Sequence, residues 1–500
     1  MLFITMTAQT TVVLCLLVKA AWGEMKFPPG FRFGAATAAY QIEGSWNVSD
    51  KAESVWDRFT HEHKYYVDSG SNGDVACDSY NRWKDDVRIA KELNLHFYRF
   101  SISWPRLLPT AFSNKISDDG RNYYNQLIDA LLEEGIEPIV TLFHLDLPQR
   151  LQDLGGWANP LIIDWFANYA RVVFSLYGDR VKTWITINEP LLICEMSYSD
   201  SNLAPGIESI ELGNYLCAKN VLLAHATAWR IYDEEFRPKY HGKVSLTNIL
   251  IWYEPTTGND SNLGNLANQL CNGIYTHPIF SKTGNWPQSV IKIVDERSKL
   301  LGYPYSLLPE FTKKEIEFIK GTYDFFGMNY YISKSIRKSL VNEHIPLWPL
   351  EGVPILGAIL ESQPTWTSGA TKWFSAHPPG LRKVLNWIRH NYGDQEIYIM
   401  ENGYATADTE LEDFDRISYL KDHLEQVLLA MKDGVNVTRY TIWSLMDNFE
   451  WSDGYTIKFG LYEVDFSSPE RTRTPRKSAE YYKNVIETHS LSDFYVKNEL

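Results

Sequence analysis

Two glutamates, Glu189 and Glu401, each follow a short segment with the apolar, β-branched composition of a buried strand. Glu189 follows Thr183–Asn188 in the stretch TWITINEPLL, and Glu401 follows Glu396–Met400. A carboxylate is costly to remove from water, so its position at the end of a buried strand indicates a salt bridge, a helix cap or a reacting group. Which of these applies depends on whether the two glutamates meet in the fold.

A pair of glutamates in an aromatic-lined site has the groups that glycoside hydrolysis needs, because one acid protonates the leaving oxygen while a carboxylate attacks the anomeric carbon. Aromatic residues make up 14% of the chain, and their faces stack on sugar rings, although a large core explains the same composition. Two other interpretations are a metal site and two unrelated buried glutamates. A metal site is disfavoured because no nearby pair of His or acidic residues has ligand spacing.

The segments that must position these glutamates alternate between short apolar runs and amphipathic stretches, which is typical of repeated βα units. The predicted strands are Phe33–Tyr40, Leu95–Ser101, Glu137–Phe143, Thr183–Asn188, Lys243–Asn248, Asp324–Tyr330, Glu396–Met400 and Arg439–Leu445. The predicted helices are Asp78–Leu93, Gly120–Glu134, Pro160–Tyr177, Gly213–Phe236, Lys313–Lys320, Pro379–Tyr392 and Asp413–Lys432. Eight strands predict an α/β fold, a closed (β/α)8 TIM barrel.

Reactive polar or aromatic residues recur at the ends of several predicted strands. In such a barrel the reaction site lies at the carboxyl ends of the strands, so these residues are expected to meet there. A lone residue of this kind is more often a cap or a satisfied core group, but their coincidence at one rim favours a site. The residues are Gln41, His144, Asn188, Glu189, Asn329, Tyr331, Glu401, Trp443, Glu450 and Trp451.

The chain has no linker rich in Pro, Gly and Ser, no internal repeat and no low-complexity tract. We therefore predict one domain over residues 24–500, with elaborated loops after the strands. The longest of these loops is Lys338–His377, which has little regular periodicity and several Pro and Trp residues.

The net charge of −14 argues against binding to nucleic acid or to an anionic membrane, because neither polyanion attracts an acidic surface. The expected partner is a small molecule. Nothing in the sequence specifies an oligomeric state.

Residues 1–23 contain a short apolar run, Thr11–Val18, followed by small residues at a plausible cleavage site, which predicts a secretory signal peptide. The run is too short to span a bilayer, and no other segment has roughly 20 uninterrupted apolar residues. The last four residues, Lys497–Leu500, differ at one position from the retention tetrapeptide Lys-Asp-Glu-Leu. Weak retention and a chance tail are both open, and we favour secretion.

In a secreted protein, the three sequons at Asn47, Asn259 and Asn436 are predicted glycosylation sites. Outside the predicted signal the chain has four cysteines, whose spacings match no metal pattern. So few cysteines in a large chain form at most one or two bridges, with a pairing that the spacing does not specify. The cysteines are Cys77, Cys194, Cys217 and Cys271.

The motifs around these residues closely resemble glycoside hydrolase family 1, the β-glucosidases and their relatives, especially the secreted insect members. The matches follow the family's order and cover nearly all of residues 24–500. They are FGAATAAYQIEG from Phe33, YRFSISWPR from Tyr98, FHLDLPQ from Phe143, TINEP from Thr186, GMNYY from Gly327, MENGY from Met400 and WSLMDNFEW from Trp443. The resemblance implies a retaining β-glucosidase that acts on a small glycoside and needs no cofactor and no metal.

The resemblance also implies roles for the two glutamates. Glu189 corresponds to the acid/base and Glu401 to the nucleophile, and a retaining mechanism predicts carboxyl groups about 5–5.5 Å apart. Arg99 and Tyr331 match the family's residues beside the nucleophile, where a cation and a donor keep it ionised. Asn329 is a further supporting residue. The positions that match the family's sugar-binding residues are Gln41, His144, Asn188, Trp443, Glu450, Trp451 and Phe459.

One residue departs from the family pattern. The family usually has His-Trp-Asp where this chain has His144-Leu145-Asp146, and the Trp donates a hydrogen bond to the sugar. Leu145 has no donor. The loss of one such bond costs about 1 kcal/mol or more if its hydroxyl partner stays unpaired, so we hypothesise an altered glycone preference or a specialised aglycone.

Two alternatives to β-glucosidase activity remain open at the level of sequence. One is a thioglucosidase that cleaves glucosinolates, whose sulfated aglycone favours cationic neighbours. Glu195 is expected to enter the aglycone region and oppose a sulfate, whereas Lys334 favours one. The other is a non-catalytic binding protein of the klotho type, in which one or both glutamates are typically lost. Glu189 and Glu401 are both present here, which disfavours it.

Overall fold

The computed structural model describes residues 25–199, 203–346, 349–407 and 409–491. Its centre is a closed barrel of eight parallel strands in the order β1-β14-β13-β7-β5-β4-β3-β2, so chain neighbours are barrel neighbours and β14 closes on β1. The predicted TIM barrel is confirmed. The strands are β1 Arg32–Ala36, β2 Phe97–Ser101, β3 Glu137–Phe143, β4 Thr183–Asn188, β5 Lys243–Ile249, β7 Phe326–Asn329, β13 Ile397–Asn402 and β14 Val437–Trp443.

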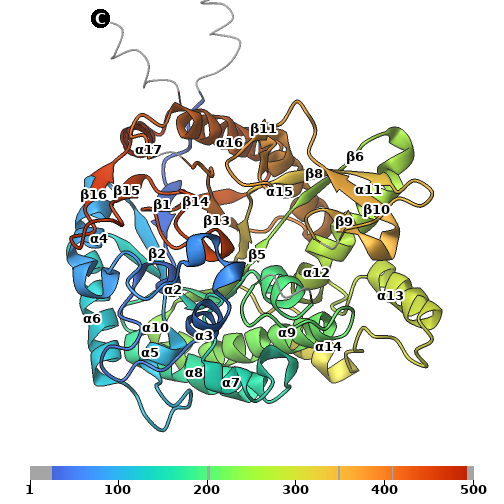
Figure 1. Ribbon diagram of the computed structural model, residues 1–500, viewed down its shortest axis with the longest axis horizontal. Helices are drawn as coiled ribbons and strands as arrows, with labels where there is room; N and C mark the ends of the chain where they lie inside the picture. Colours follow the sequence, from blue (N-terminus) through green and yellow to red (C-terminus); the bar gives the residue numbers. More distant parts are fainter. Residues whose placement is uncertain (1–24, 200–202, 347–348, 408, 492–500) are drawn as a thin grey trace, which may run out of the picture.

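Helices form an outer layer around the barrel (Figure 1). Helix α8 illustrates why: Ile162, Phe166, Ala170, Val173 and Tyr177 recur every three or four residues and are all buried, as an amphipathic helix against a sheet requires. The longer helices are α4 Ser79–Glu92, α6 Asp118–Glu133, α8 Ile162–Tyr177, α9 Gly213–Ile231, α13 Gln288–Leu300, α15 Pro378–Tyr392, α16 Phe414–Lys432 and α17 Lys477–Thr488. The shorter ones are α2 Ala39–Ile42, α3 Val55–Glu62, α5 Trp104–Leu107, α7 Gln149–Gln152, α10 Arg237–Tyr240, α11 Ser261–Asn268, α12 Ile274–Phe280 and α14 Lys313–Ile319.

Charged and polar side chains close the amino ends of the barrel strands. Above them, apolar side chains fill the barrel. Glu137, which begins β3, accepts a hydrogen bond from Arg439 of β14 at 2.9 Å and one from Thr183 of β4 at 2.7 Å. A separate core cluster consists of Phe97, Ile139, Ile185, Phe325, Tyr398 and Met400. These layers fill the barrel, so only its carboxyl ends are left to form a site.

The first strand is shorter than predicted. The prediction ran from Phe33 to Tyr40, but β1 ends at Ala36 and residues Ala39–Ile42 form helix α2. A contact with the neighbouring strand β2 accompanies this turn, because the Ala39 amide donates to the Ser101 hydroxyl at 2.7 Å. Gln41 therefore reaches the rim from a helix and not from a strand end.

The predicted loop Lys338–His377 contains regular structure. Strand β10 (Ala358–Glu361) pairs antiparallel with β8 (Ser333–Lys338) in a sheet of order β6-β8-β10-β9, with β6 at Trp252–Pro255 and β9 at Gly352–Val353. Figure 1 shows this sheet beside the barrel. The remaining strands are β11 Thr367–Ser368, β12 Ser375–Ala376, β15 Tyr462–Val464 and β16 Arg473–Pro475.

The predicted signal peptide, residues 1–23, and the tail Lys497–Leu500 lie outside the described residues. Within the described part of the chain, no helix combines the length and apolar character needed to cross a membrane.

Candidate active site

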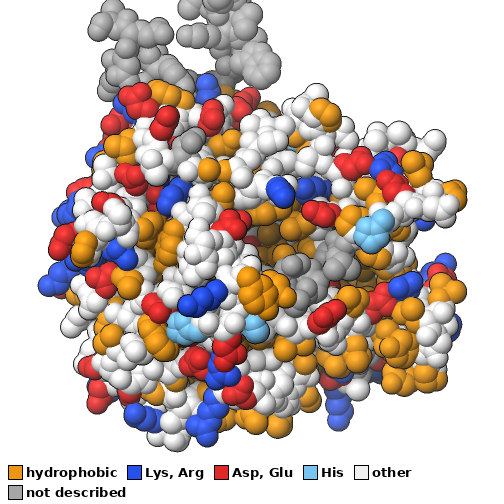
Figure 2. Space-filling view, viewed as in Figure 1, with side chains coloured by type: hydrophobic (Ala, Val, Ile, Leu, Met, Phe, Trp, Pro, Cys, Tyr) orange, Lys and Arg blue, Asp and Glu red, His pale blue; other side chains and the backbone are white. Residues whose placement is uncertain are grey.

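A cavity of about 340 Å³ lies at the carboxyl ends of the barrel strands. In the view of Figure 2 this face is hollowed near its centre, with hydrophobic side chains in the hollow. Glu189 from the end of β4 and Glu401 from β13 both line the cavity, so the two predicted glutamates meet. The other lining residues are Tyr66, His144, Leu192, Met196, Leu203, Ile249, Ile251, Tyr331, Ile332, Leu350, Trp373, Trp443, Glu450, Trp451, Ser452, Asp453 and Phe459.

Glu401 is held by one cation and one hydroxyl. The Arg99 guanidinium donates to its Oε1 at 2.6 Å, and the Tyr331 hydroxyl donates to its Oε2 at 2.8 Å. Arg99 comes from β2 and is fully buried. Both carboxylate oxygens of Glu401 thus have a donor that favours the ionised form.

Arg99 is itself fixed by three further acceptors. It donates to the Asn188 side-chain oxygen at 2.8 Å, to the Met400 carbonyl at 3.0 Å and to the Thr141 hydroxyl at 3.1 Å. A guanidinium held at every edge cannot swing away from Glu401, so the charge is preorganised.

Glu189 has a different set of neighbours. The Asn329 amide donates to its Oε1 at 2.7 Å and to the Asn188 side-chain oxygen at 3.2 Å. The backbone of Glu189 is in the left-handed region with φ of 50°, a conformation that costs a non-glycine residue free energy and is frequent at functional sites. Its amide donates to the Thr247 carbonyl at 2.8 Å, which holds this turn.

These surroundings affect the pKa values of the two carboxyl groups differently. Burial and the nearby charge of Glu401 raise the pKa of Glu189 well above its usual range. Burial also raises the pKa of Glu401, but Arg99 and Tyr331 oppose that rise. The proton shared by the pair therefore resides on Glu189, and Glu401 is the carboxylate.

A second group of side chains forms an aromatic and polar end of the cavity. The His144 ring stacks on Trp443 and Trp451, with centroid distances of 5.8 and 6.0 Å. Burial and Arg99 lower the pKa of His144 well below its usual value, so the ring is neutral. Gln41 donates to the Phe449 carbonyl at 2.9 Å and to Glu450 at 3.5 Å.

Glu450 also accepts from the Trp443 indole at 3.4 Å, and burial raises its pKa to about 8. Several acceptor or donor atoms in this group remain unpaired although they are buried: among the described residues, Gln41 Oε1, His144 Nδ1 and Asn329 Oδ1 have no hydrogen-bond partner. Unpaired buried polar atoms next to a cavity suit a ligand that carries many hydroxyl groups.

Phe459 lines the cavity as predicted, with its ring edge-on to Tyr331 at 5.9 Å. Two predicted aglycone residues do not line it. Glu195 follows Leu192 in the turn η4 (Leu192–Met196), where Leu192 and Met196 face the cavity and Glu195 points to another side. Because η4 is a π-helix with hydrogen bonds between residues five apart, Met196 stays close to the face of Leu192, whereas Glu195, three residues after Leu192, is turned to another side.

Lys334 is the other residue that the structure places elsewhere. It is buried in β8, and its ammonium group donates to the Ser362 hydroxyl at 3.3 Å. Lys334 is not among the residues that line the cavity, although Tyr331 and Ile332 just before it are. Leu145 is also absent from the lining residues and is packed in the core.

The apolar wall of the cavity was missed by sequence reasoning. It comes from scattered places in the chain, among them Leu203, Ile251 and Leu350. One signal was available, because Leu192 and Met196 have helical spacing directly after Glu189.

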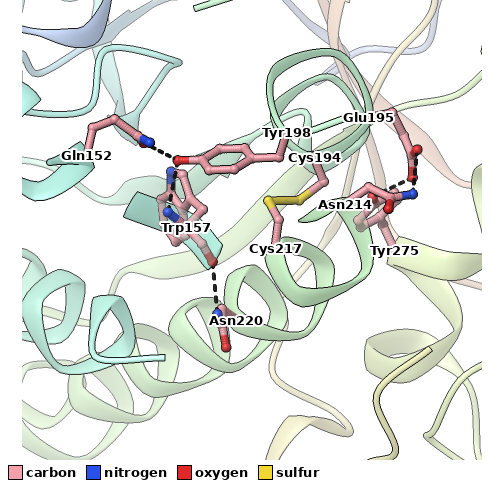
Figure 3. Close-up of a disulfide and its surroundings, with 9 residues drawn as sticks. All are labelled: Gln152, Trp157, Cys194, Glu195, Tyr198, Asn214, Cys217, Asn220 and Tyr275. Atoms are coloured by element: carbon pink, nitrogen blue, oxygen red, sulfur yellow. Dashed lines mark hydrogen bonds between the residues drawn. A yellow bond between two sulfur atoms is a disulfide. The ribbon is translucent and has the colours of Figure 1, made fainter. Parts of the chain in front are cut away.

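A disulfide joins Cys194 of η4 to Cys217 of α9, at a sequence separation of 23 (Figure 3). Cys77 and Cys271 are buried and unbridged. Among the described residues, no group of three or more His, Cys, Asp or Glu side chains could hold a metal ion.

Known proteins share both the sequence and this fold. The chain is 44% identical over 470 residues to Myrosinase 1 of Brevicoryne brassicae and 42% identical over 472 residues to the cytosolic beta-glucosidase of Homo sapiens, covering 93% of this chain and 99% of each relative. Among solved structures, aphid myrosinase matches with a TM-score of 0.89 at 44% identity, over 93% of this chain and 100% of that chain. A beta-glucosidase from Thermotoga maritima in complex with castanospermine matches with a TM-score of 0.83 at 36% identity, over 94% and 100%. Because the family model of glycosyl hydrolase family 1 also matches residues 24–491, the chain belongs to this family and is a glycoside hydrolase.

Proposed function

We propose that the protein is a retaining β-glucosidase that releases terminal β-D-glucose from small glycosides with an apolar aglycone. The observation that carries the proposal is that the two facing glutamates have different hydrogen-bond donors and different nearby charges. Glu401 accepts hydrogen bonds from Arg99 and Tyr331. Glu189 accepts one from the neutral amide of Asn329, and the charge of Glu401 disfavours its ionised form. This arrangement supplies a carboxylate and a carboxylic acid in one site, which is what a double displacement needs.

In the first step Glu401 attacks the anomeric carbon and forms a glycosyl ester, while Glu189 gives its proton to the leaving oxygen. Tyr331 and Arg99 fix the direction of the carboxylate, so little reorganisation is needed at the moment of attack. The aglycone leaves as an alcohol.

In the second step Glu189 changes from an acid to a base. Once Glu401 is esterified its negative charge is gone, and the repulsion that raised the pKa of Glu189 disappears. Glu189, which has just lost its proton, then acts as a base and takes a proton from water as the water attacks the ester. Two inversions give net retention of configuration, which NMR detection of the first-formed glucose anomer tests directly.

The aromatic and polar end of the cavity is suited to the glucose ring. Trp443 and Trp451 offer faces for stacking, and Gln41, His144 and Asn188 offer amide and imidazole groups to the hydroxyls. Glu450 accepts hydrogen bonds at this end, and in its ionised form these bonds are charge-assisted.

The other end of the cavity supports an apolar aglycone. Its described wall includes Leu192, Met196, Ile249, Ile251, Ile332 and Leu350. Among the described lining residues the acidic side chains are Glu189, Glu401, Glu450 and Asp453, and none of these lining residues is Lys or Arg. A sulfated aglycone would leave water without gaining a Lys or Arg partner from these lining residues, so the cavity favours an O-glucosidase over a thioglucosidase despite the likeness to a myrosinase.

A matched pair of substrates tests this choice. Benzyl β-glucoside and benzyl glucosinolate carry the same benzyl group and differ in the sulfated linkage. We expect kcat/KM for the glucoside to exceed that for the glucosinolate by at least about a hundredfold, because a sulfate that leaves water without a cationic partner costs several kcal/mol. Equal or faster cleavage of the glucosinolate would assign the protein to the thioglucosidases, and no turnover of either would support a non-catalytic binding protein.

We also propose that the protein is secreted and N-glycosylated. Asn47, Asn259 and Asn436 are all exposed, so each sequon is accessible to modification. When the full chain is expressed in insect cells, we expect the culture medium to contain a protein that begins at residue 24. This protein should lose mass on treatment with an N-glycosidase. Protein that stays in the cell and keeps its mass would contradict the proposal.

A further inference from the structure

Two exposed tyrosines, Tyr65 and Tyr66, lie at the mouth of the active-site cavity. Tyr66 lines the cavity and is nevertheless 42% exposed, so it lies where the cavity opens to the surface. Tyr65 is 78% exposed, and its ring contacts that of Tyr66 with a centroid distance of 4.7 Å. Single exposed apolar side chains are common on protein surfaces, but two neighbouring rings that continue the wall of a ligand cavity are typical of a binding surface.

Buried aromatic rings connect this pair to the sugar-binding end of the cavity. The ring of Tyr66 lies 5.6 Å from that of Phe59, and Phe59 lies 5.6 Å from Trp56. Trp56 in turn packs against Trp451, which lines the cavity, at 4.8 Å. Both Phe59 and Trp56 belong to α3 and are buried. Because a packed interior holds its side chains in place, these rings fix the position of Tyr66 relative to the cavity.

The backbone of the two tyrosines is also attached to the rim of the cavity. Residues Lys64–Tyr66 form the turn η1, and Val67 directly after it is buried. The next residue, Asp68, accepts a hydrogen bond from the Thr456 hydroxyl at 3.2 Å. Thr456 follows closely after the turn η9 (Trp451–Asp453), whose three residues all line the cavity. The tyrosines are therefore held beside the mouth from both ends of their segment.

The size of the cavity indicates which part of a substrate can reach these rings. In the proposed function the glucose ring occupies the aromatic and polar end, and the aglycone lies along the apolar wall. The volume of about 340 Å³ is near the lower end of the roughly 300–1,000 Å³ that is usual for small-molecule sites. A long aglycone must therefore continue through the mouth, where it meets Tyr66 and then Tyr65. Aromatic rings pair edge-on or in offset stacks, with an attraction beyond that of the buried area alone.

We propose that Tyr65 and Tyr66 form an outer binding site for an aromatic ring at the far end of a long aglycone. This inference rests on the proposed function and adds a substrate class to it, namely β-glucosides in which an apolar chain separates the sugar from a terminal aromatic ring. The chain lies along the apolar wall, and the terminal ring packs against the two tyrosine rings.

Matched pairs of substrates test whether an aromatic ring is recognised at the mouth. Each pair consists of an ω-phenylalkyl and an ω-cyclohexylalkyl β-glucoside with the same straight linker, so the two compounds differ only in the terminal ring. With short linkers the ring stays inside the cavity, and we expect similar kcat/KM values. With linkers that let the ring reach Tyr65, kcat/KM for the phenyl compound should be about two- to tenfold higher, because only the aromatic ring gains from pairing with the tyrosines. A ratio near one at every linker length would overturn the proposal.

Variants of Tyr65 test the location of the ring. In Tyr65→Ala the preference for the phenyl compound should fall to about that seen with short linkers, whereas Tyr65→Phe should keep it, because the ring and not the hydroxyl makes the contact. The matched control is Tyr305→Ala, which removes a tyrosine that is 69% exposed and is not among the residues that line the cavity. An unchanged preference in Tyr65→Ala, or an equal loss in Tyr305→Ala, would overturn the proposal.

A binding measurement separates the failure of this proposal from a failure of the proposed function. The same pairs are titrated into Glu401→Gln, which lacks the nucleophile, and calorimetry gives the ratio of the two dissociation constants. We expect the same preference of about two- to tenfold for the phenyl compound at the longer linkers. If the unaltered protein hydrolysed no β-glucoside, the proposed function would fail, and this ratio would still decide the outer site. Equal dissociation constants would overturn it.

Discussion

The active-site cavity and a second cavity, which Glu195 and Ser199 line, lie on two sides of the turn η4, and each contains a buried glutamate from the same segment of chain. Glu189 is 5% exposed and Glu195 is 6% exposed, so burial does not distinguish them. What differs is the facing group. Glu189 faces Glu401, which Arg99 holds as a carboxylate, whereas Glu195 accepts from Asn214 and Tyr275.

This difference shows what makes a buried carboxyl group reactive. A facing carboxylate raises the pKa of Glu189, so that it holds a proton. Once that charge is neutralised, the pKa of Glu189 falls and the proton is released. Glu195 accepts from two neutral donors, Asn214 and Tyr275, where Glu189 faces a carboxylate, so these contacts give it no second acid with which to divide the work of a reaction.

The largest effect is expected for Glu401→Gln. Without the nucleophile, kcat/KM for nitrophenyl β-glucoside should fall by roughly 10⁴–10⁶. The matched control is Glu195→Gln, which makes the same atomic change in an equally buried residue and should lower kcat/KM by less than about tenfold. Similar losses in the two variants would contradict the division between the cavities.

Glu189→Gln is expected to lose about 10²–10⁴ in kcat/KM, but only for substrates whose leaving group needs a proton. With dinitrophenyl β-glucoside the first step needs no acid, so glycosylation should be nearly as fast as in the unaltered protein. Pre-steady-state kinetics with dinitrophenyl and methoxyphenyl glucosides measure the contrast. An equal loss on both substrates would mean that Glu189 does not act as the acid.

Tyr331→Phe removes one hydrogen bond to ionised Glu401 and should lower kcat/KM by about ten- to a hundredfold, since such bonds contribute roughly 1.5–3 kcal/mol. The pKa of Glu401 rises because its ionised form loses a donor. Glu401 must be ionised to attack, so the acidic limb of the kcat/KM profile should move to higher pH. A lower rate without this displacement would show that Tyr331 only packs against the site.

Cys194→Ala with Cys217→Ala should destabilise the protein by about 3 kcal/mol, because the bridge closes a loop with a separation of 23 residues. Denaturant unfolding measures the loss. The bridge anchors the turn whose Leu192 forms the aglycone wall, so KM for benzyl β-glucoside should rise more than kcat falls. Cys271→Ala, which removes a buried thiol but no cross-link, is the control, and an equal effect there would reject this role for the bridge.

The smallest effect concerns single methylene groups of the substrate. For a series of straight-chain alkyl β-glucosides, kcat/KM should increase about fourfold per added methylene until the apolar wall is covered, in line with ~0.8 kcal/mol for each buried CH₂. A flat series, measured under identical conditions, would show that the aglycone does not contact Leu192, Met196 and Ile251.

The barrel and the catalytic pair could be predicted because both depend on local patterns. Strands such as β4 (TWITIN) and β13 (IYIMEN) are short runs rich in β-branched or aromatic residues, and Glu189 follows directly after β4. The order of the strands in a barrel then brings these ends together without further information. Local patterns did not predict the position of Gln41, because β1 ends at Ala36 and the Ala39 amide of helix α2 bonds to Ser101 of the neighbouring strand, 62 positions away.

The features that sequence reasoning missed depend on pairings between distant residues or on the phase of a short turn. The pairing of β10 with β8 joins segments about 25 residues apart, and four cysteines allow three pairings. The direction of Glu195 depends on how η4 winds over five residues, where a shift of one position changes the cavity that a side chain enters.

The central claim is that Glu401 forms the bond to glucose and Glu189 handles the proton. The most direct measurement is intact-protein and peptide mass spectrometry of Glu189→Gln after mixing with dinitrophenyl β-glucoside and rapid acid quenching. Without the base the second step is slow, so the account predicts that one glucosyl group accumulates on the peptide that contains Glu401. A protein that turns over the substrate without an adduct, or an adduct on any other residue, would contradict it.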